Sequence, residues 1–258
     1  MSRYRAFAAL LCAAALTSCD YEKIAVQDIH VPAPGAQVKF FNFGLNAPGV
    51  NFYANDTKVT GILTATGTEA TTGVGFGGVA SAGLYSGLAP GQYTLSGRIA
   101  ATTDKDLAIS EAATTLETGK RYSFYQSGPY NTTTKKVDAF MVEDPFAEEI
   151  NWSSATVRFV NAIHNANPMT LLITNVETGQ VLTIGGAVAY KSAGAFTVVP
   201  EGIYNVATRY TGVSTNAITR TAVTFSASRV YTVSSRGDIT VTSTTAATRP
   251  FLDVTVNR

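Results

Sequence analysis

The chain has 258 residues, with 19 lysine and arginine residues against 18 aspartate and glutamate residues. A net charge this close to zero gives no reason to expect nucleic acid or an anionic lipid surface as a partner. Charged residues make up only 14% of the chain, while threonine, valine, alanine and glycine are abundant, which favours β-sheet.

The first 18 residues have the pattern of a secretory signal peptide. Arg3 and Arg5 form a basic start, and the uncharged apolar run that follows is too short to span a bilayer. The run ends in Leu-Thr-Ser-Cys at residues 16–19, which resembles the lipobox of bacterial lipoproteins, whose cysteine receives a diacylglycerol. We expect residues 1–18 to be removed and Cys19 to carry the lipid; an ordinary signal peptide with an incidental cysteine is the alternative.

The cysteine count fits an exported, acylated chain. The two cysteines are Cys12 and Cys19, so removal of the signal peptide takes Cys12 away and leaves Cys19 acylated. The mature protein then has no disulfide and no thiolate metal ligand. It also loses Arg3 and Arg5, which leaves 17 basic residues (19 less two) against 18 acidic ones. Burial of apolar surface and backbone pairing must therefore supply its stability.

Residues 19–35 have the composition of a lipidated tether. Pro32 and Pro34 favour extended backbone at its end. Asp20 directly follows the lipidated cysteine, a position that resembles an inner-membrane retention signal in enteric bacteria but, together with Glu22, a surface-export signal in Bacteroidetes. We expect a protein that is exported and lipid-anchored in the cell envelope, in the outer membrane, with the periplasmic or surface face left open.

Beyond the tether the sequence repeats itself in order. From this repeat we predict a first domain over residues 36–145, a short linker over 146–153 and a second domain over 154–258, each of ordinary domain size. The blocks that match are 36–42 with 155–161, 81–83 with 192–194, 88–95 with 199–206, Arg98 with Arg209, 122–124 with 231–233, and 137–140 with 252–255.

Each copy has the pattern of short strands. Tyr93, Leu95 and Ile99 alternate with polar residues, which is typical of antiparallel strands that have one face on a core. Turn residues punctuate these runs, as in Pro90-Gly91, and we find no helical period of useful length. The sequence therefore predicts an all-β chain: two tandem immunoglobulin-like antiparallel β-sandwich domains after a signal peptide and tether, with seven to nine strands apiece.

One bacterial family resembles this chain over most of residues 36–258. Asn-Ala-Pro-Gly-Val-Asn-Phe-Tyr at residues 46–53 follows the strand at 38–42, and Pro-Gly-Gln-Tyr-Thr-Leu follows at 90–95; both resemble the domain of unknown function 4397 family. The second copy departs from the pattern, because residues 165–171 lack the Ala-Pro turn and the tyrosine. The resemblance implies a β-sandwich in an exported, often lipidated, envelope protein, and it implies no activity and no catalytic residues.

Few residues have a pattern typical of catalysis. Residues 73–78 formally satisfy GxGxxG, but no helical period and no suitably spaced acidic residue follow, so we predict a glycine-rich loop or strand edge. No GxSxG motif is present, and His164 is the one histidine of the predicted domains, where a polar loop residue is expected. His30 and His164 are too far apart to suggest zinc. We expect no enzyme activity, no metal and no cofactor.

Acidic residues occur in three small groups at expected strand ends and turns. We predict solvated charges there. The alternatives are a pair of glycosidase carboxylates in one of these groups, or a calcium site at the turn that contains Asp104 and Asp106. The groups are Asp104 and Asp106, Glu143 and Asp144, and Glu148 and Glu149.

Aromatic residues supply the remaining candidate site. Tyr122, Phe124, Tyr125 and Tyr130 lie close together in the first copy, and alternation places Tyr122 and Phe124 on one face and Tyr125 on the other. Outward rings could stack on sugars or form a protein contact surface. The alternative is that these rings cover sheet surface or pack on the neighbouring domain.

These observations favour a non-enzymatic cell-envelope lipoprotein that presents two β-sandwich modules for protein contact or adhesion. A carbohydrate-binding surface lipoprotein is the alternative, supported by the tyrosine cluster alone. An enzyme would require a cleft that brings two carboxylates together. The expected partners are the membrane, through the N-terminal lipid, and an envelope protein or glycan whose identity is open.

Overall fold

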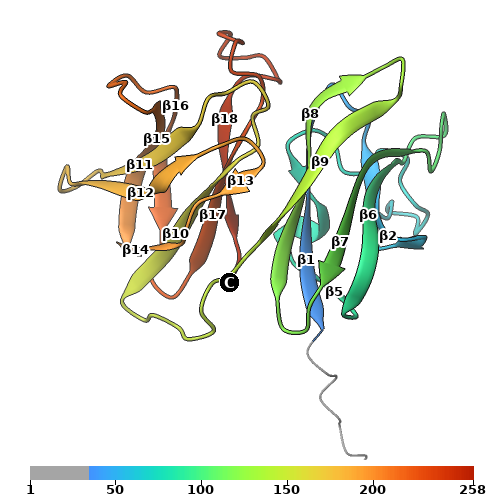
Figure 1. The fold of residues 1–258 in the computed structure, drawn as a ribbon, viewed down its shortest axis with the longest axis horizontal. Coiled ribbons are helices and arrows are strands. Elements are labelled where there is room, and N and C mark those ends of the chain that lie inside the picture. Colours follow the sequence, from blue (N-terminus) through green and yellow to red (C-terminus); the bar gives the residue numbers. More distant parts are fainter. Residues whose placement is uncertain (1–34) are drawn as a thin grey trace, which may run out of the picture. The chain divides into compact units, whose positions relative to one another are not determined.

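A computed structural model describes residues 35–258 as an all-β structure (Figure 1). The predicted signal peptide, Cys19 and residues 19–34 of the predicted tether lie outside the described residues. Within residues 35–258 the helical structure consists of one short 3-10 turn at Ala80–Gly83. The helical structure of that same part of the chain includes no segment with the length and hydropathy of a membrane-spanning helix.

The first sandwich has nine strands in two sheets. One sheet has the order β4-β1-β8-β9, with β5 also paired to β1, and the other has the order β3-β2-β6-β7. The strands are β1 (Ala36–Leu45), β2 (Val50–Ala54), β3 (Thr57–Lys58), β4 (Gly78–Val79), β5 (Ser86–Leu88), β6 (Gly91–Ile99), β7 (Ala108–Leu116), β8 (Arg121–Asn131) and β9 (Lys136–Glu143).

The second sandwich repeats this topology strand for strand. Its sheets have the orders β13-β10-β17-β18, with β14 paired to β10, and β12-β11-β15-β16. The two-sandwich, all-β fold predicted from the sequence is thereby confirmed. The strands are β10 (Ser154–Asn161), β11 (Met169–Asn175), β12 (Val181–Val188), β13 (Ser192–Ala193), β14 (Thr197–Pro200), β15 (Gly202–Tyr210), β16 (Ile218–Phe225), β17 (Val230–Arg236) and β18 (Phe251–Val256).

Each copy contains one parallel pair among its antiparallel ladders. β1 pairs with β8, and β10 with β17, in parallel. Between β1 and β8 the chain crosses to the other sheet and returns, so both strands run in the same direction. Alternation along a strand reports which face is buried but not the direction of its neighbour, so the sequence pattern could not reveal these pairs.

The ladders also correct one block of the sequence repeat. Ser123 lies opposite Val142 in the first copy, and its counterpart Thr232 lies opposite Thr255 in the second. Val142 therefore corresponds to Thr255, so residues 137–140 match 250–253 and the predicted match to 252–255 is wrong by two residues. A shift of two residues keeps every side chain on the same face, so the pattern of apolar residues does not detect it.

Each sandwich has its own apolar core. In the first, the rings of Phe40, Phe52 and Phe124 pack with centroids 5.1–5.9 Å apart. In the second, Phe225 packs between Tyr204 and Tyr231. The central strands β1, β8, β10 and β17 are buried on both faces, not on alternate residues. A strand buried on both faces has packing on either side of the sheet, and the second layer here is the other sandwich.

Candidate functional site

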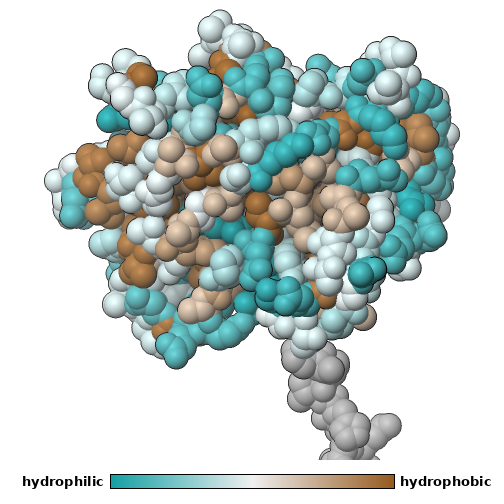
Figure 2. Space-filling view, in the orientation of Figure 1, coloured by the Kyte–Doolittle hydropathy of each residue, from teal (hydrophilic) through white to brown (hydrophobic). Residues whose placement is uncertain are grey.

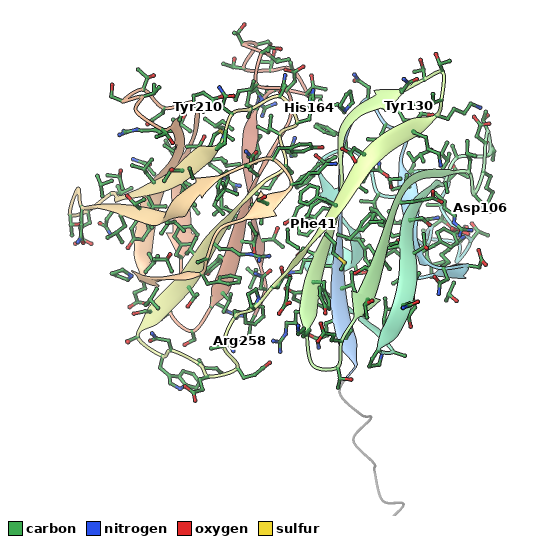
Figure 3. All side chains as sticks on the ribbon, viewed as in Figure 1. Phe41, Asp106, Tyr130, His164, Tyr210 and Arg258 are labelled. Atoms are coloured by element: carbon green, nitrogen blue, oxygen red, sulfur yellow. The ribbon has the colours of Figure 1, made fainter. Side chains whose placement is uncertain are left out.

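The two sandwiches meet along the sheet faces that point away from their own cores. We call this contact between β1, β8 and β9 on one side and β10, β17 and β18 on the other the joint. Its apolar part contains Phe41, Phe43, Tyr125, Phe140, Val160 and Ala162. Figure 3 shows Phe41 between the two sandwiches. The joint is therefore a core of its own between two complete domains.

Three stacked rings form the centre of the joint. Tyr125 on β8 lies parallel to Phe41 on β1, with ring centroids 4.3 Å apart, and to Phe140 on β9, at 4.9 Å. The hydroxyl of Tyr125 lies 3.0 Å from Ser234 Oγ on the second sandwich. Neighbouring strands thus present one aromatic surface, and the second sandwich covers it and satisfies its one polar atom.

The predicted aromatic ligand surface is wrong for three of its four residues. Tyr122 is 5% exposed, and Phe124 and Tyr125 are fully buried. Tyr122 and Phe124 lie in the first core, and Tyr125 lies in the joint, because the two faces of β8 are covered by different partners. Tyr130 is half-buried, packs on the edge of the first core and lies near the end of β8 (Figure 3).

A buried lysine crosses the joint from the first sandwich. Lys39 on β1 is fully buried. Its Nζ donates to the carbonyl oxygen of Val256 at 2.7 Å and to Asn257 Oδ1 at 3.0 Å, and it lies 4.3 Å from the centre of the Tyr85 ring. The pKa of Lys39 is lowered to about 8, mainly by burial; the nearby negative charge of Asp144 opposes this shift and the positive charge of Arg158 adds to it.

A buried arginine crosses the joint in the opposite direction. Arg158 on β10 donates through Nη1 to the carbonyl oxygen of Glu143 at 2.7 Å and through Nη2 to the carboxylate of Asp144. Its Nε donates to Thr232 Oγ1 at 3.1 Å, and its guanidinium lies 4.7 Å from the ring centre of Phe196. All three guanidinium nitrogens therefore have acceptors, which a buried arginine requires.

The two crossings are related by an approximate two-fold axis. Lys39 and Arg158 occupy matching positions of the repeat, and each reaches the residues that end the last strand of the other sandwich. The same surface of each copy therefore contacts its counterpart, as in an isologous dimer. The symmetry is broken at one place: Arg158 meets the carboxylate of Asp144, whereas Lys39 meets the amide of Asn257.

Asp144 is the strongest departure from the expected solvated charges. Its side chain is 0% exposed. Its carboxylate accepts hydrogen bonds from Arg158, from the Tyr85 hydroxyl at 2.6 Å and from Ser123 Oγ at 2.8 Å. Burial, followed by the nearby negative charge of Asp144, raises the pKa of Tyr85. The prediction of a solvated Asp144 is wrong because the second sandwich covers the end of β9.

The other predicted acidic residues are exposed. Asp104 pairs with Lys135 at 2.7 Å. Asp106 accepts from the Tyr53 hydroxyl at 2.7 Å and lies at the side of the first sandwich away from the joint (Figure 3). The carboxylates of Glu143, Glu148 and Glu149 are exposed as well. No group of three or more histidine, cysteine or acidic side chains in residues 35–258 is placed to hold a metal ion.

The glycine-rich segment 73–78 packs against the second sandwich. Gly77 has φ +77°, and a Cβ there would lie 2.9 Å from the Arg236 guanidinium carbon. That guanidinium pairs with Asp253 and lies over the ring of Phe76. The segment leads into β4 and a 3-10 turn, as the predicted loop or strand edge requires, so its glycines allow close approach of a side chain and not of a phosphate.

His164 lies in the loop after β10, as expected from the sequence. It is half-buried beside Gly128 of the first sandwich, where a Cβ on Gly128 would lie 3.7 Å from the His164 Cβ. Its Nδ1 has no hydrogen-bond partner among the described residues. Within residues 35–258 no hydrogen bond joins His164 to a serine or threonine hydroxyl, the contact through which the base of a triad activates its nucleophile.

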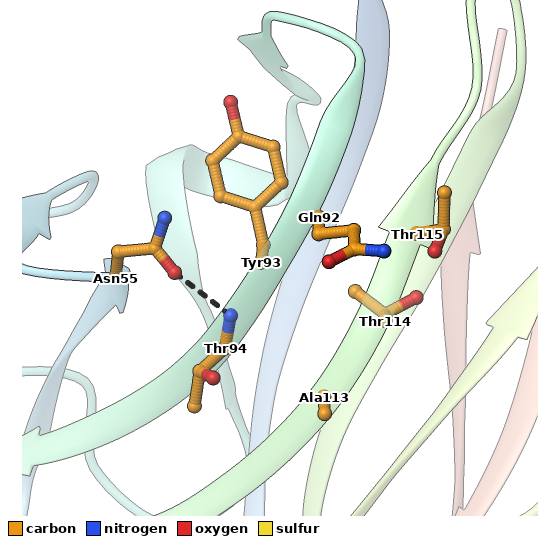
Figure 4. Close-up of a pocket in the computed structure, with 7 residues that line it drawn as sticks. All are labelled: Asn55, Gln92, Tyr93, Thr94, Ala113, Thr114 and Thr115. Atoms are coloured by element: carbon orange, nitrogen blue, oxygen red, sulfur yellow. Dashed lines mark hydrogen bonds between the residues drawn. The ribbon is translucent and has the colours of Figure 1, made fainter.

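Two of the open surfaces on residues 35–258 lie outside the joint and differ in character. One is a hollow of about 580 Å³ on the face of β6 and β7 in the first sandwich (Figure 4). Its lining is uncharged and mostly polar: Asn55, Gln92, Tyr93, Thr94, Ala113, Thr114 and Thr115. Asn55 Oδ1 accepts the backbone N–H of Thr94 at 2.9 Å, which fixes the amide at the rim.

The other open surface is apolar and lies on the second sandwich. Val176, Val181 and Ile203 are 50–55% exposed. Val176 N donates to Ile203 O at 2.8 Å, and Val181 pairs with Thr174, two residues before Val176, so the three lie on neighbouring strands of one sheet. Figure 2 shows hydrophobic residues gathered on this side, over β11 and β12. A contiguous exposed apolar group is one mark of a protein contact surface.

Sequence reasoning missed the residues that carry the joint. Neither Lys39 nor Arg158 is predicted as a functional residue, although the two stand at the same position in otherwise apolar segments of both copies. A charge repeated inside an apolar strand was the available signal. It indicates a polar position on a face that is covered by something other than the strand's own core.

Comparison with known proteins gives a family but no function. The model described as Domain of unknown function (DUF4397) matches residues 36–172. No curated protein matches the chain. Among solved structures, the Bacillus anthracis TIE protein is similar over 78% of this chain and 33% of that chain, at 12% identity and a TM-score of 0.23. The chain thus spans a third of that protein, and a likeness this distant supports no functional statement.

Proposed function

This chain belongs to the family of the domain of unknown function 4397, and we propose that it is a non-enzymatic, lipid-anchored protein of the cell envelope whose two immunoglobulin-like sandwiches present one rigid surface to another protein. The observation that carries the proposal is the joint. Buried charges and stacked rings fix one sandwich against the other, and a partner that contacts both copies loses less conformational freedom on binding a rigid pair than a flexible one.

The apolar group around Val181 is the proposed contact point. Valine and isoleucine at half exposure offer apolar area that a partner can bury. Because β12 is an edge strand of its sheet, a partner strand can also pair with its free backbone groups. We therefore expect a protein partner that supplies an apolar strand.

Site-specific cross-linking tests this contact in intact cells. A photo-reactive residue in place of Val181 in the full-length chain is expected to give a discrete cross-linked product of higher mass. The matched control replaces Thr115, which is exposed on the first sandwich, and is expected to give none. No product at Val181, or the same products at both positions, contradicts the proposed contact.

The lipid anchor is tested at Cys19, which lies outside the described residues. Replacement of Cys19 by alanine removes the thiol to which a diacylglycerol would be attached. The variant is expected to move from the membrane fraction to the soluble fraction of fractionated cells, because no other lipid attachment is proposed. A variant that remains bound to the membrane as fully as the parent chain contradicts anchoring through Cys19.

A carbohydrate-binding function is the second candidate, now supported by the hollow on β6 and β7 and not by the tyrosine cluster. The amide and hydroxyl groups of its lining can hydrogen-bond to a neutral sugar, while the Tyr93 ring packs on the first core and closes the hollow from below. Titration with neutral oligosaccharides is expected to give saturable binding that Gln92→Ala weakens roughly tenfold, as loss of one to two hydrogen bonds would. Binding that Gln92→Ala leaves unchanged, or no binding, removes this candidate.

A further inference from the structure

An amine and a carboxamide face each other inside the joint. Lys39 Nζ donates to Asn257 Oδ1 at 3.0 Å, although the two residues lie 218 positions apart in the chain. At the matching place on the other side of the two-fold axis, Arg158 faces the carboxylate of Asp144. The first crossing thus combines a nucleophile that can be acylated with an acyl group that has a leaving nitrogen.

We propose that Lys39 and Asn257 condense to an intramolecular amide bond, which covalently joins the first strand of one sandwich to the end of the last strand of the other. The bond would form between Lys39 Nζ and Asn257 Cγ, and it would close most of the described chain into a ring. The inference concerns the joint alone and does not depend on which partner the exposed surface binds.

The reaction balances without an oxidant or other co-reactant. The ammonium group of Lys39 first loses one proton to solvent. The neutral amine attacks Asn257 Cγ, the new N–C bond forms, and the Cγ–Nδ2 bond breaks. Nδ2 leaves as ammonia, with its own two hydrogens and one from the attacking amine. The product is a secondary amide, and no atom changes oxidation state.

The surroundings favour each requirement of this step. Lys39 is fully buried, and its pKa of about 8 leaves roughly a tenth of the amine neutral at pH 7. Asn257 Nδ2 donates to Thr232 Oγ1 at 2.7 Å, which orients the amide with Oδ1 toward the lysine. The Tyr85 ring, 4.3 Å from Nζ, covers the amine. Two reactants held in contact gain the large advantage of an intramolecular reaction.

Peptide mapping of the full-length chain tests the bond directly. Trypsin does not cleave after an acylated lysine, and the bond between Arg249 and Pro250 resists it. The linked protein is therefore expected to yield residues 24–58 joined to residues 237–258, with the summed mass of the two peptides less one ammonia molecule. Quantitative recovery of an unlinked peptide 24–39, cleaved after Lys39, from folded protein would overturn the proposal.

Two substitutions supply matched controls. Lys39→Arg keeps the charge and the hydrogen-bond donors, and it copies the residue at the matching position of the repeat, so the joint is expected to fold; the branched peptide should disappear. Asn257→Asp should form the same bond with loss of water in place of ammonia. A branched peptide that persists in Lys39→Arg assigns the bond to another residue and overturns the proposal.

The pH dependence of bond formation gives a second readout. Because the neutral amine reacts and its pKa is about 8, the rate in freshly folded protein is expected to rise about fivefold between pH 7 and pH 8 and to level off above pH 9. Complete absence of the branched peptide after incubation at pH 9 contradicts the proposal. A failed test here leaves the cross-linking result at Val181 unaffected, so the two proposals can be separated.

Discussion

Replacing Asp144 with alanine is expected to lower the free energy of unfolding by about 3–5 kcal/mol, the range typical when one partner of a buried ion pair is removed. The loss leaves the fully buried guanidinium of Arg158 without its carboxylate and removes the acceptor of the Tyr85 and Ser123 hydroxyls. Urea denaturation measures the change. Both proteins should carry Lys39→Arg, so that a covalent link contributes to neither.

Two controls separate burial from charge. Glu148→Ala removes an ion pair with Arg121 whose acidic side chain is 72% exposed, and it should change the free energy of unfolding by no more than about 0.5 kcal/mol. Adding Arg158→Met to Asp144→Ala removes the unpaired charge and should recover much of the lost stability. If Asp144→Ala costs no more than Glu148→Ala, the buried pair does not hold the joint.

Tyr125→Ala is the second substitution with a large expected effect, about 3–5 kcal/mol, because it leaves a cavity where a fully buried ring stacks on two others. The substitution should weaken the contact between the two sandwiches and leave the core of each sandwich intact. We therefore expect one cooperative unfolding transition to separate into two, one for each sandwich. Circular dichroism measured along a denaturant series reports this separation as two steps in place of one.

Substitutions on the two faces of β8 give the comparison. Phe124→Ala empties a site in the core of the first sandwich, so it should destabilise that sandwich while the second retains its own stability. Tyr125→Phe keeps the ring and loses only the contact with Ser234 Oγ, which should cost about 1 kcal/mol. A Tyr125→Ala protein that unfolds in one transition, as stable as Tyr125→Phe, contradicts the role assigned to the ring stack.

The sequence predicts the two sandwiches because alternation and repetition are local properties of the chain. It places Tyr122 and Phe124 opposite Tyr125 correctly, since side chains in a strand point to alternate faces. It does not say what covers the second face. An outward tyrosine on an exposed sheet and one in a joint have the same sequence pattern, so the aromatic ligand surface was predicted where the structure has a packed contact.

The prediction of a solvated carboxylate is wrong at Asp144 for the same physical reason. Asp144 ends a strand, where solvation is the usual outcome, and its burial depends on Arg158 arriving from the other copy. Contacts between domains leave no period in the sequence. The repeat did contain one usable sign, the matched basic residues Lys39 and Arg158, whose two-fold relation becomes visible only when the two copies are placed against each other.

The most direct measurement of a rigid joint is a distance distribution between the two sandwiches. Spin labels at Thr115→Cys on β7 and Val181→Cys on β12 report on opposite modules, and the sequence has no cysteine between residues 35 and 258. Pulsed electron paramagnetic resonance is expected to give one narrow distance, which broadens when Asp144→Ala is added. A broad distribution in the parent protein, unchanged by that substitution, would mean that the sandwiches move independently and that the joint does not hold them.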